Sequence, residues 1–205
     1  MILKEQILRM KRLIIELSPD SAGVQEFLDD VKKHPELLQH LKFDRFKDLE
    51  DYVYDASGRE FDDLRNEVNY FIQRRKKYLK SEMDEIERVV QHLNRVENMN
   101  VSVEDVYQAL DNAVEVKIPD EVWNKLENTE CNQIKKGEMK KVMALAKKYN
   151  KQDPRELKKA LQSGDYKRPL ILKFGDRFHL VAGNTRLCTA AAMGIKPQVL
   201  IGEIF

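Results

Sequence analysis

The chain has 205 residues, with 36 lysines and arginines against 35 aspartates and glutamates, for a formal net charge of +1 at pH 7. This length suits one large or two small domains. A content of 42% hydrophobic and 35% charged residues is typical of a helix-rich globular protein and excludes a disordered or fibrous chain. No apolar run approaches the roughly 20 residues that cross a bilayer, and charged side chains interrupt the first 17 residues, which argues against a signal peptide. We therefore expect a cytoplasmic protein without a membrane partner.

The cysteines and histidines indicate neither a disulfide framework nor a metal site. Cys131 and Cys188 lie far apart and form no C-x-x-C pair, so reduced thiols are expected. The four histidines are scattered, and no two have the H-x-x-x-H spacing that places two ligands on one helix face.

The near-zero net charge is a sum over two unlike halves. Residues 1–112 carry 18 basic and 24 acidic side chains, about −6, whereas residues 113–205 carry 18 and 11, about +7. The two halves are therefore expected to differ in the partners that they attract.

The first half carries apolar residues at intervals of three and four, the pattern of amphipathic helices. The pattern predicts helices over residues 1–17, from Asp20 or Ser21 to about Lys33, over a short segment that begins at Pro35, and from a cap at Asp44 to about Tyr54.

Residues 57–97 contain no proline, and no glycine after Gly58, while apolar residues recur mostly by steps of three and four. The pattern predicts one long helix or a helical hairpin. It would serve either as a coiled-coil seam in a homo-oligomer or as the spine of an intramolecular bundle. The apolar repeat is interrupted at Arg75 or Lys76, which favours the bundle.

The same region holds a basic cluster that runs from Arg74 to Lys77 and includes Lys80. It is either a phosphate-binding patch or a solvated helix face. Acidic residues between Glu82 and Glu87 follow at a spacing that allows pairing with the cluster, which favours the solvated face.

Farther along, the apolar period changes. Ser102 with Asp105 three residues later predicts a capped helix to about Ala113. Beyond it, apolar and polar residues alternate as in half-buried strands. Strands are predicted over 114–118, 170–174, 178–182 and 198–204, and the second and third of the four form a hairpin with its turn at Gly175-Asp176. Helices are predicted from Pro119-Asp120, over 137–150, from Asp153-Pro154 to about Leu161, and over 187–193. Gly164 and Gly194 follow the last two helices. The prediction is an α+β protein with a helical domain over 1–112 and a small α/β domain over 113–205.

One short segment has the residue types of a phosphate-binding site. Gly183-Asn184-Thr185-Arg186 lies between a predicted strand and an alanine-rich helix. Glycine allows a tight turn, the first amides of a helix attract anions, Thr185 adds a hydroxyl, and Arg186 can bind two phosphate oxygens at once. The alternative is a structural turn in which Arg186 forms a salt bridge with a neighbour.

The wider sequence around this segment resembles the ParB/sulfiredoxin superfamily. The resemblance runs from Arg168-Pro169-Leu170-Ile171-Leu172 through Gly183-Asn184-Thr185-Arg186-Leu187 and Ala190-Ala191-Ala192-Met193-Gly194-Ile195 to Pro197-Gln198-Val199, and covers roughly residues 114–205. It implies a ParB/sulfiredoxin-like α/β fold that binds ATP, ADP or CTP, with or without Mg²⁺, through Gly183, Asn184, Thr185 and Arg186. The opening segment of the helical half, Leu3 to Lys11, is faintly similar to proteins of large tailed phages, which would place the chain in the host cytoplasm.

Departures from the superfamily narrow the implied activity. The catalytic cysteine of sulfiredoxins corresponds to Asn184, which excludes sulfinic acid reduction, and Cys188 is expected to be packed rather than reactive. The free serine kinases carry an acidic residue just before the glycine, where this chain has Ala182. Partition proteins continue into a helix-turn-helix module that has no counterpart before Phe205, so plasmid partitioning is not expected.

Three functional hypotheses follow. In the first, the chain is a nucleotide hydrolase or small kinase in which the box amides and Arg186 stabilise phosphoryl charge and Asp120 or Glu121 accepts a proton. In the second, the Lys-rich stretch 135–177, with 14 basic and 5 acidic residues, binds DNA or RNA. In the third, the helical half mediates assembly and the C-terminal domain is structural.

Overall fold

The computed structural model describes residues 21–204, so the helix expected over residues 1–17 lies outside the described residues, as does the segment with the phage similarity. The fold is α+β, as predicted. The chain divides into two compact units, one ending at Arg75 and one beginning at Lys76. With that division the charges become 13 basic and 16 acidic side chains in residues 1–75, and 23 and 19 in residues 76–205, a smaller asymmetry than the one at Asn112.

The division differs from the predicted domain boundary after Asn112. Two of the helices before that position, α6 (Met83–Val96) and α7 (Val103–Asp111), share an apolar core with the sheet of the second unit. Amphipathic periodicity shows that a helix has an apolar face, but it does not show what that face will cover.

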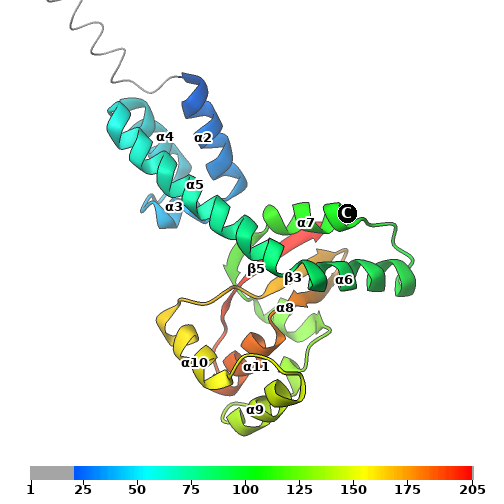
Figure 1. Ribbon diagram of the computed structural model, residues 1–205. Coiled ribbons are helices and arrows are strands. Elements are labelled where there is room, and N and C mark those ends of the chain that lie inside the picture. The colour runs from blue at the N-terminus through cyan, green and yellow to red at the C-terminus, as the bar shows by residue number, and fades with distance from the viewer. Residues whose placement is uncertain (1–20, 205) are drawn as a thin grey trace, which may run out of the picture. The chain divides into compact units, whose positions relative to one another are not determined.

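The first unit is helical. It contains α2 (Ser21–Lys33), α3 (Leu37–His40), α4 (Phe46–Asp55) and most of α5 (Gly58–Ser81) (Figure 1). Its core is formed by apolar residues of all four helices and by Leu41, which follows α3: Val24, Phe27, Leu28, Val31, Leu37, Leu41, Leu49, Val53, Phe61 and Val68. The N-cap of α4 is Arg45, which makes the expected cap at Asp44 wrong by one residue.

The segment 57–97 forms two successive helices, α5 and α6, that separate at Glu82. Ser57 and Glu60 bond reciprocally at the start of α5, which explains why the helix begins there. The apolar stripe packs inside the chain: Phe61 and Val68 in the core of the first unit, and Leu79 and Ile86 in a core of the second. This is the bundle alternative for α5, whereas α6 packs against the sheet.

Arg75 fits neither alternative proposed for the basic cluster. Its side chain is buried, donates from Nη2 to Glu36 Oε1 at 2.5 Å, and lies with Nη1 3.0 Å from His34 Nδ1. A buried guanidinium needs such partners because an uncompensated charge in a protein interior is costly.

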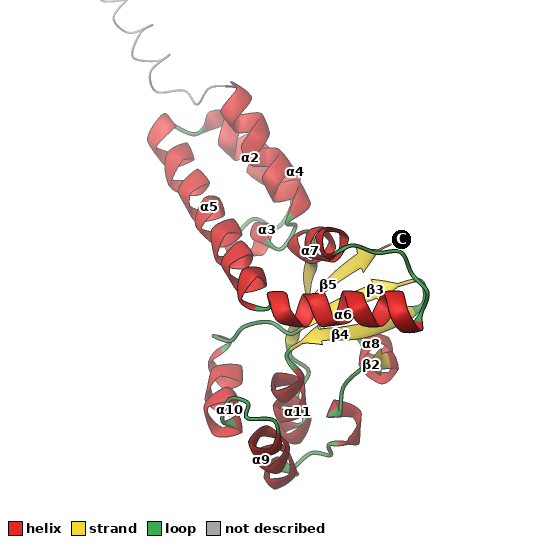
Figure 2. Ribbon diagram, turned by 45° about the vertical axis from the view of Figure 1, so that its right-hand side comes forward, coloured by secondary structure: helices red, strands yellow, loops and turns green. Residues whose placement is uncertain are grey.

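The second unit is built on a five-stranded mixed sheet in the order β1-β5-β3-β4-β2 (Figure 2). The pairs β1–β5 and β3–β4 are antiparallel, whereas β5–β3 and β4–β2 are parallel. The strands are β1 (Val114–Lys117), β2 (Leu126–Glu127), β3 (Leu170–Phe174), β4 (Arg177–Ala182) and β5 (Gln198–Ile204). Of these, only the short β2 was missed by the sequence analysis.

Helices cover both faces of the sheet (Figure 2). On one face lie α6 and α7, and on the other α8 (Asp120–Lys125), the 3₁₀ turn η1 (Cys131–Gln133), α9 (Met139–Lys148) and α11 (Asn184–Met193). The helix α10 (Pro154–Ser163) packs against α9 and α11. Because both faces are covered, β3 and β4 are almost continuously apolar.

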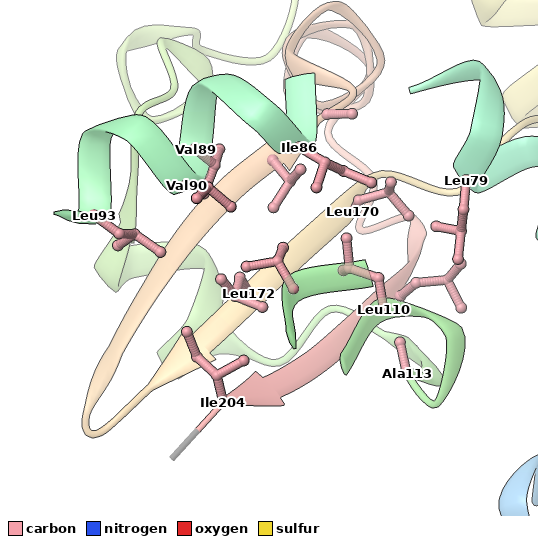
Figure 3. Packing of buried hydrophobic residues seen from close by; sticks show 14 of the residues in the cluster. Leu79, Ile86, Val89, Val90, Leu93, Leu110, Ala113, Leu170, Leu172 and Ile204 are labelled. Carbon is pink, nitrogen blue, oxygen red and sulfur yellow. The ribbon is translucent and has the colours of Figure 1, made fainter. Parts of the chain in front are cut away.

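Each face has its own core. Leu170 and Leu172 of β3 point to α6 and α7, where they meet Ile86, Val90 and Leu110 (Figure 3). Ile171, between them, belongs to the core on the opposite face. This alternation is the period of two that a strand imposes on its side chains.

The residues that were predicted to cap and end helices do so in the structure. Ser102 and Asp105 form the predicted capping box of α7, Asp153 caps α10, and Gly164 ends α10 in the left-handed conformation. Gly202 on β5 allows a close approach of α7, since an added Cβ would lie 2.4 Å from the Ala109 carbonyl oxygen. Within residues 21–204, no helix is long and apolar enough to span a bilayer.

Candidate phosphate-binding cleft

The turn from β4 into α11 is where the sequence predicts the phosphate site. Gly183 is the N-cap of α11 with φ = 103°, a left-handed conformation that favours glycine. A Cβ at this position would come within 2.9 Å of Cα and Cβ of Pro169. Gly183 is therefore required both by its backbone conformation and by the close packing of the turn.

Asn184, the second residue of the box, holds a neighbouring loop in place. Its Oδ1 accepts hydrogen bonds from Thr129 Oγ1 at 2.8 Å and from the Glu130 amide at 3.3 Å, and its Nδ2 donates to Glu130 Oε2. The Asn184 side chain thus ties the start of α11 to the segment between β2 and η1.

Arg186, predicted to chelate phosphate, is held by protein groups instead. Its Nη1 donates to Tyr78 Oη at 2.8 Å and to the Lys167 carbonyl oxygen at 2.7 Å, and its Nη2 lies 3.4 Å from Glu82 Oε1. The side chain is 14% exposed. The arrangement matches the alternative expectation for this segment, a structural turn in which Arg186 forms a salt bridge with a neighbour.

Tyr78 completes this arrangement. Its hydroxyl donates to the Arg168 carbonyl oxygen at 2.6 Å while it accepts from Arg186. Burial raises the pKa of Tyr78 to about 12, with a smaller opposing effect from Arg186. Tyr78 therefore remains a neutral hydrogen-bonding partner at physiological pH.

A cleft of about 590 Å³ opens directly at the box. Its floor includes Leu180 to Ala182 of β4, the four box residues and Cys188. One wall is apolar and is formed mainly by α9 and α10, and the other is charged and comes from α6. The apolar wall consists of Val142, Leu145, Ala146, Tyr149 and Leu157, and the charged wall of Glu82, Glu85 and Arg88, with Lys151 at the end of the apolar one.

Ion pairs organise the charges of the cleft. Glu85 lies 3.1 Å from Arg88 and 3.5 Å from Lys151, so it links the two walls. Glu82 pairs with Arg186. Glu130 also lines the cleft, and it makes no ion pair with any described cation. Glu82 and Glu85 were expected to pair with the basic cluster 74–77, but both line the cleft, where Glu82 pairs with Arg186 and Glu85 with Arg88 and Lys151.

Asp120 and Glu121, the carboxylates proposed for proton transfer, do not line the cleft. Asp120 pairs with Lys196, beyond the C-terminal end of α11, whereas the box lies at the N-terminal end. A ten-residue helix separates the two ends by about 15 Å. Glu121 pairs with Lys125 on its own helix, which holds the pKa of Glu121 below its usual range.

The cysteines are both buried, as predicted for Cys188. Cys188 lines the cleft, and its Sγ lies 3.7 Å from Asn184 Oδ1. Burial raises the pKa of the Cys188 thiol to about 12, so the thiol stays protonated and unreactive at neutral pH.

Glu130, Tyr149 and Lys151 could not be predicted as site residues, because they come from two connecting segments, β2–η1 and α9–α10, and no local motif joins them. A partial signal existed on α6, where Glu82, Glu85 and Arg88 recur every third residue and so share one helix face. Comparison with protein-family models, curated proteins and solved structures finds no match to the chain.

Proposed function

We propose that residues 76–205 form a ParB/sulfiredoxin-like nucleotide-binding domain that holds the phosphates of ATP, ADP or CTP in the cleft at the start of α11. The observation that carries the proposal is the position of the cleft, which opens at Gly183 to Arg186, the residues that the sequence assigns to phosphate. Its volume of about 590 Å³ lies within the roughly 300–1,000 Å³ typical of small-molecule sites.

The two walls suit the two ends of a nucleotide. The phosphates would lie against the first-turn amides of α11, which have no intrahelical partners, and the Thr185 hydroxyl. Lys151 and Arg88, which share Glu85 as a counter-ion, are the exposed cations nearest to hand for a phosphate in the same cleft. The base would lie against the apolar wall, where Tyr149 offers a half-exposed aromatic ring. Arg186 has the role of a positioning residue, since Tyr78 and backbone carbonyls hold its guanidinium.

Mg²⁺ enters the proposal together with the nucleotide. Carboxylate oxygens are ligands that Mg²⁺ prefers, and the cleft offers Glu82, Glu85 and Glu130. In the part of the chain that the structure describes, no three His, Cys, Asp or Glu side chains gather closely enough to hold a metal ion by themselves. One or two of the carboxylates together with phosphate oxygens would make the usual Mg²⁺ environment.

In the enzymatic form of the proposal, the cleft hydrolyses or transfers the terminal phosphoryl group. Glu130 then has the role first given to Asp120 or Glu121, because it lines the cleft without a cationic partner. Its carboxylate would accept the proton of the attacking water or hydroxyl, while the helix amides stabilise charge on the phosphoryl oxygens.

The decisive experiment measures binding of ATP, ADP, CTP and GTP to the full chain, with and without Mg²⁺, by calorimetry and by thermal shift. The key variant is Thr185→Glu, which places a carboxylate where a phosphate would lie. A negative charge in the first turn does not destabilise the helix, because it interacts favourably with the helix dipole. We expect nucleotide affinity to fall at least about tenfold, or about 1.4 kcal/mol.

Thr185→Gln is the matched control, since it has the size of glutamate without the charge, and it should retain most of the affinity. Failure of every nucleotide to bind, or equal binding by Thr185→Glu and the unmodified chain, would contradict the proposal. Phosphate release in the presence of MgATP tests the enzymatic form: Glu130→Gln should abolish turnover but not binding, whereas Asp120→Asn should change neither.

A second candidate function, nucleic-acid binding through the Lys-rich stretch 135–177, is favoured by one observation. Five lysines on α9 and α10 are exposed and pair with none of the described carboxylates: Lys140, Lys147, Lys148, Lys158 and Lys159. Such charges are available to polyanions, and binding should weaken steeply with salt. Fluorescence anisotropy with labelled DNA and RNA over a salt series tests this function, with Lys147→Glu and Lys158→Glu as variants.

A further inference from the structure

The strand β1 lies at one edge of the five-stranded sheet and pairs with β5. Among residues 21–204, no strand pairs with the other side of β1. An edge strand presents backbone N–H and C=O groups to which a strand of another chain can be added. What such an edge accepts depends on which of its groups are free and on the side chains beside them.

Hydrogen bonds of β5 establish which residues of β1 face away from the sheet. The Leu200 amide donates to the Pro169 carbonyl oxygen at 2.9 Å, on the side of β3. Gln198, two residues earlier, points the same way, and its amide donates to Tyr166 Oη at 2.7 Å. In an antiparallel pair, opposite residues that do not bond to each other direct their backbone groups outward on both strands.

These two residues of β5 lie opposite Glu115 and Lys117 of β1. Glu115 and Lys117 therefore direct their backbone N–H and C=O groups to the open edge. The next residue bonds inward, as the alternation requires, because the Ile118 amide donates to the Pro197 carbonyl oxygen at 3.0 Å. The described part of the chain supplies no hydrogen-bond partner for the outward groups.

The side chains at this edge carry opposite charges two positions apart. Glu115 and Lys117 share one face of the sheet, because alternate residues of a strand point to the same side. Glu115 Oε1 accepts a hydrogen bond from Arg168 Nε at 2.7 Å, which holds the carboxylate beside the strand. Lys117 is exposed and makes no ion pair with a described carboxylate, so it is available to a carboxylate of another chain.

These charges are self-complementary between two copies of β1. The antiparallel registers that join the outward groups are centred on Glu115, on Val116 or on Lys117. The first places Glu115 opposite Glu115 and the last places Lys117 opposite Lys117, and like charges directly opposite each other are destabilising. The register centred on Val116 places Glu115 opposite Lys117 of the second copy at two equivalent positions.

We propose that the protein forms a weak symmetric dimer in which the β1 strands of two copies pair antiparallel around Val116 and join their sheets. Glu115 of each copy exchanges backbone hydrogen bonds with Lys117 of the other, and the two side chains form a cross-strand ion pair. Val114, which is 41% exposed, comes to lie opposite Ile118 of the second copy. The dimer depends on the sheet edge alone, so it is independent of nucleotide binding by the cleft.

A lysine at a sheet edge commonly prevents such pairing. Lys117 opposes only the register that places it opposite itself, because Glu115 of the second copy neutralises it in the register centred on Val116. The strand has four residues. The interface therefore belongs to the weak class that buries less than about 1,200 Å².

The experiment measures self-association of the full chain by sedimentation velocity at concentrations up to about 1 mM, a range that covers weak interfaces. We expect a reversible equilibrium between monomer and dimer. Lys117→Glu places glutamate opposite glutamate at both cross-strand positions, and it should weaken association at least about tenfold. Lys140→Glu, at an exposed position of α9, is the matched control and should leave the dissociation constant unchanged.

Glu115→Lys is the reciprocal variant and should also fail to associate alone. Mixed with Lys117→Glu it restores opposite charges at both cross-strand positions, so the mixture should associate although neither variant does by itself. Glu115→Lys also removes the bond to Arg168, and circular dichroism checks that it folds. Lys117→Pro leaves that bond intact and removes an outward N–H, so it should abolish association independently of charge.

Amide NMR signals locate the interface. Dilution of the unmodified chain should move the Glu115 and Lys117 amide signals, because their N–H groups are free in the monomer and bonded in the dimer. A chain that stays monomeric up to about 1 mM would leave the edge to a strand of another protein and overturn the proposal. Equal association of Lys117→Glu and Lys140→Glu, or association that leaves the Glu115 and Lys117 amides unmoved, would place the contact elsewhere and overturn it too.

Discussion

The helical unit and the α/β unit use buried arginines in different ways. In the helical unit, Arg75 lies within the core beside Glu36 and His34. In the α/β unit, Arg186 lies at the edge of a cleft, with Tyr78 and backbone carbonyl oxygens as further acceptors beside Glu82. The first arrangement neutralises a charge inside a core, whereas the second fixes the shape of a candidate binding surface.

An arginine next to a favourable motif is therefore not by itself a ligand-binding residue. Arg75 belongs to the basic cluster and Arg186 to the glycine box, and for each segment phosphate binding was one of the predicted functions. In the structure, both guanidiniums are hydrogen-bonded to protein groups. A ligand in the α/β unit can meet the backbone at the start of α11 and Thr185, together with Arg88 and Lys151, which are exposed but share Glu85 as their counter-ion.

The largest expected effect comes from breaking the buried pair of the helical unit. Arg75→Met keeps the length of the side chain but removes the guanidinium that pairs with Glu36, and loss of one partner of a buried ion pair costs about 3–5 kcal/mol. Urea unfolding followed by circular dichroism should show this loss. Arg59→Met, at an exposed position of the same helix, should cost little.

The unfolding experiment also has an internal reference for the other unit. Trp123, the single tryptophan, lies on α8, so its fluorescence reports on the α/β unit alone. For Arg75→Met, the circular dichroism transition should move more than the fluorescence transition. A loss of less than about 1 kcal/mol, the size expected for an exposed ion pair, would contradict the description of Arg75 and Glu36 as a buried pair that stabilises the helical unit.

The second effect concerns the α/β unit. Gly202→Ala places a methyl group against the Ala109 carbonyl, and overpacking of this kind costs about 1–3 kcal/mol. Gly175→Ala meets no atom within 4 Å, so it measures only the cost of a positive φ, about 1–2 kcal/mol, which Gly202 does not incur. If Gly202→Ala costs less than about 1 kcal/mol, the lower end expected for overpacking, the approach of α7 to β5 is not as close as described.

A smaller effect is expected where Arg186 has several acceptors. Tyr78→Phe removes a hydroxyl that bonds to both Arg186 and the Arg168 carbonyl, with an expected cost of about 1 kcal/mol. The cost is small because Arg186 retains the Lys167 and Arg168 carbonyls. Chemical denaturation measures it, and a loss as large as that of Arg75→Met would remove the distinction between the two arginines.

The smallest effect is a pH dependence that arises from His179. Burial lowers its pKa in the folded state, so below about pH 6.5, the usual histidine pKa, the unfolded chain takes up a proton that the folded chain does not. His179 should therefore reduce stability as the pH falls through that value and have no such effect at pH 7.5. Urea midpoints at pH 7.5 and 5.5 should differ less for His179→Gln than for the unmodified chain.

Most elements could be predicted because their signals are local. The Ser102–Asp105 capping box, the Asp153-Pro154 start and Gly164 end of α10, and the hairpin at Gly175-Asp176 each depend on a few adjacent residues. The hairpin alternative for 57–97 allowed a break, but its position at Glu82 was not predicted, since neither proline nor glycine marks it. The domain boundary was missed because the partner of an amphipathic face is set by tertiary packing.

The candidate site was predictable only in part, for the same reason. The box at 183–186 has a local pattern, and the structure places a cleft there. The partners of Arg186 include Tyr78, 108 positions away, and backbone carbonyls that no residue pattern identifies.

The buried thiol of Cys188 can report how often the cleft opens. The thiol is buried at the cleft floor, and its pKa of about 12 makes the reactive thiolate scarce at neutral pH. Alkylation must wait for local opening, just as amide hydrogen exchange does. In a Cys131→Ser chain, the rate of maleimide reaction would measure how often the cleft opens around Cys188. A ligand that holds the walls together would lower this rate.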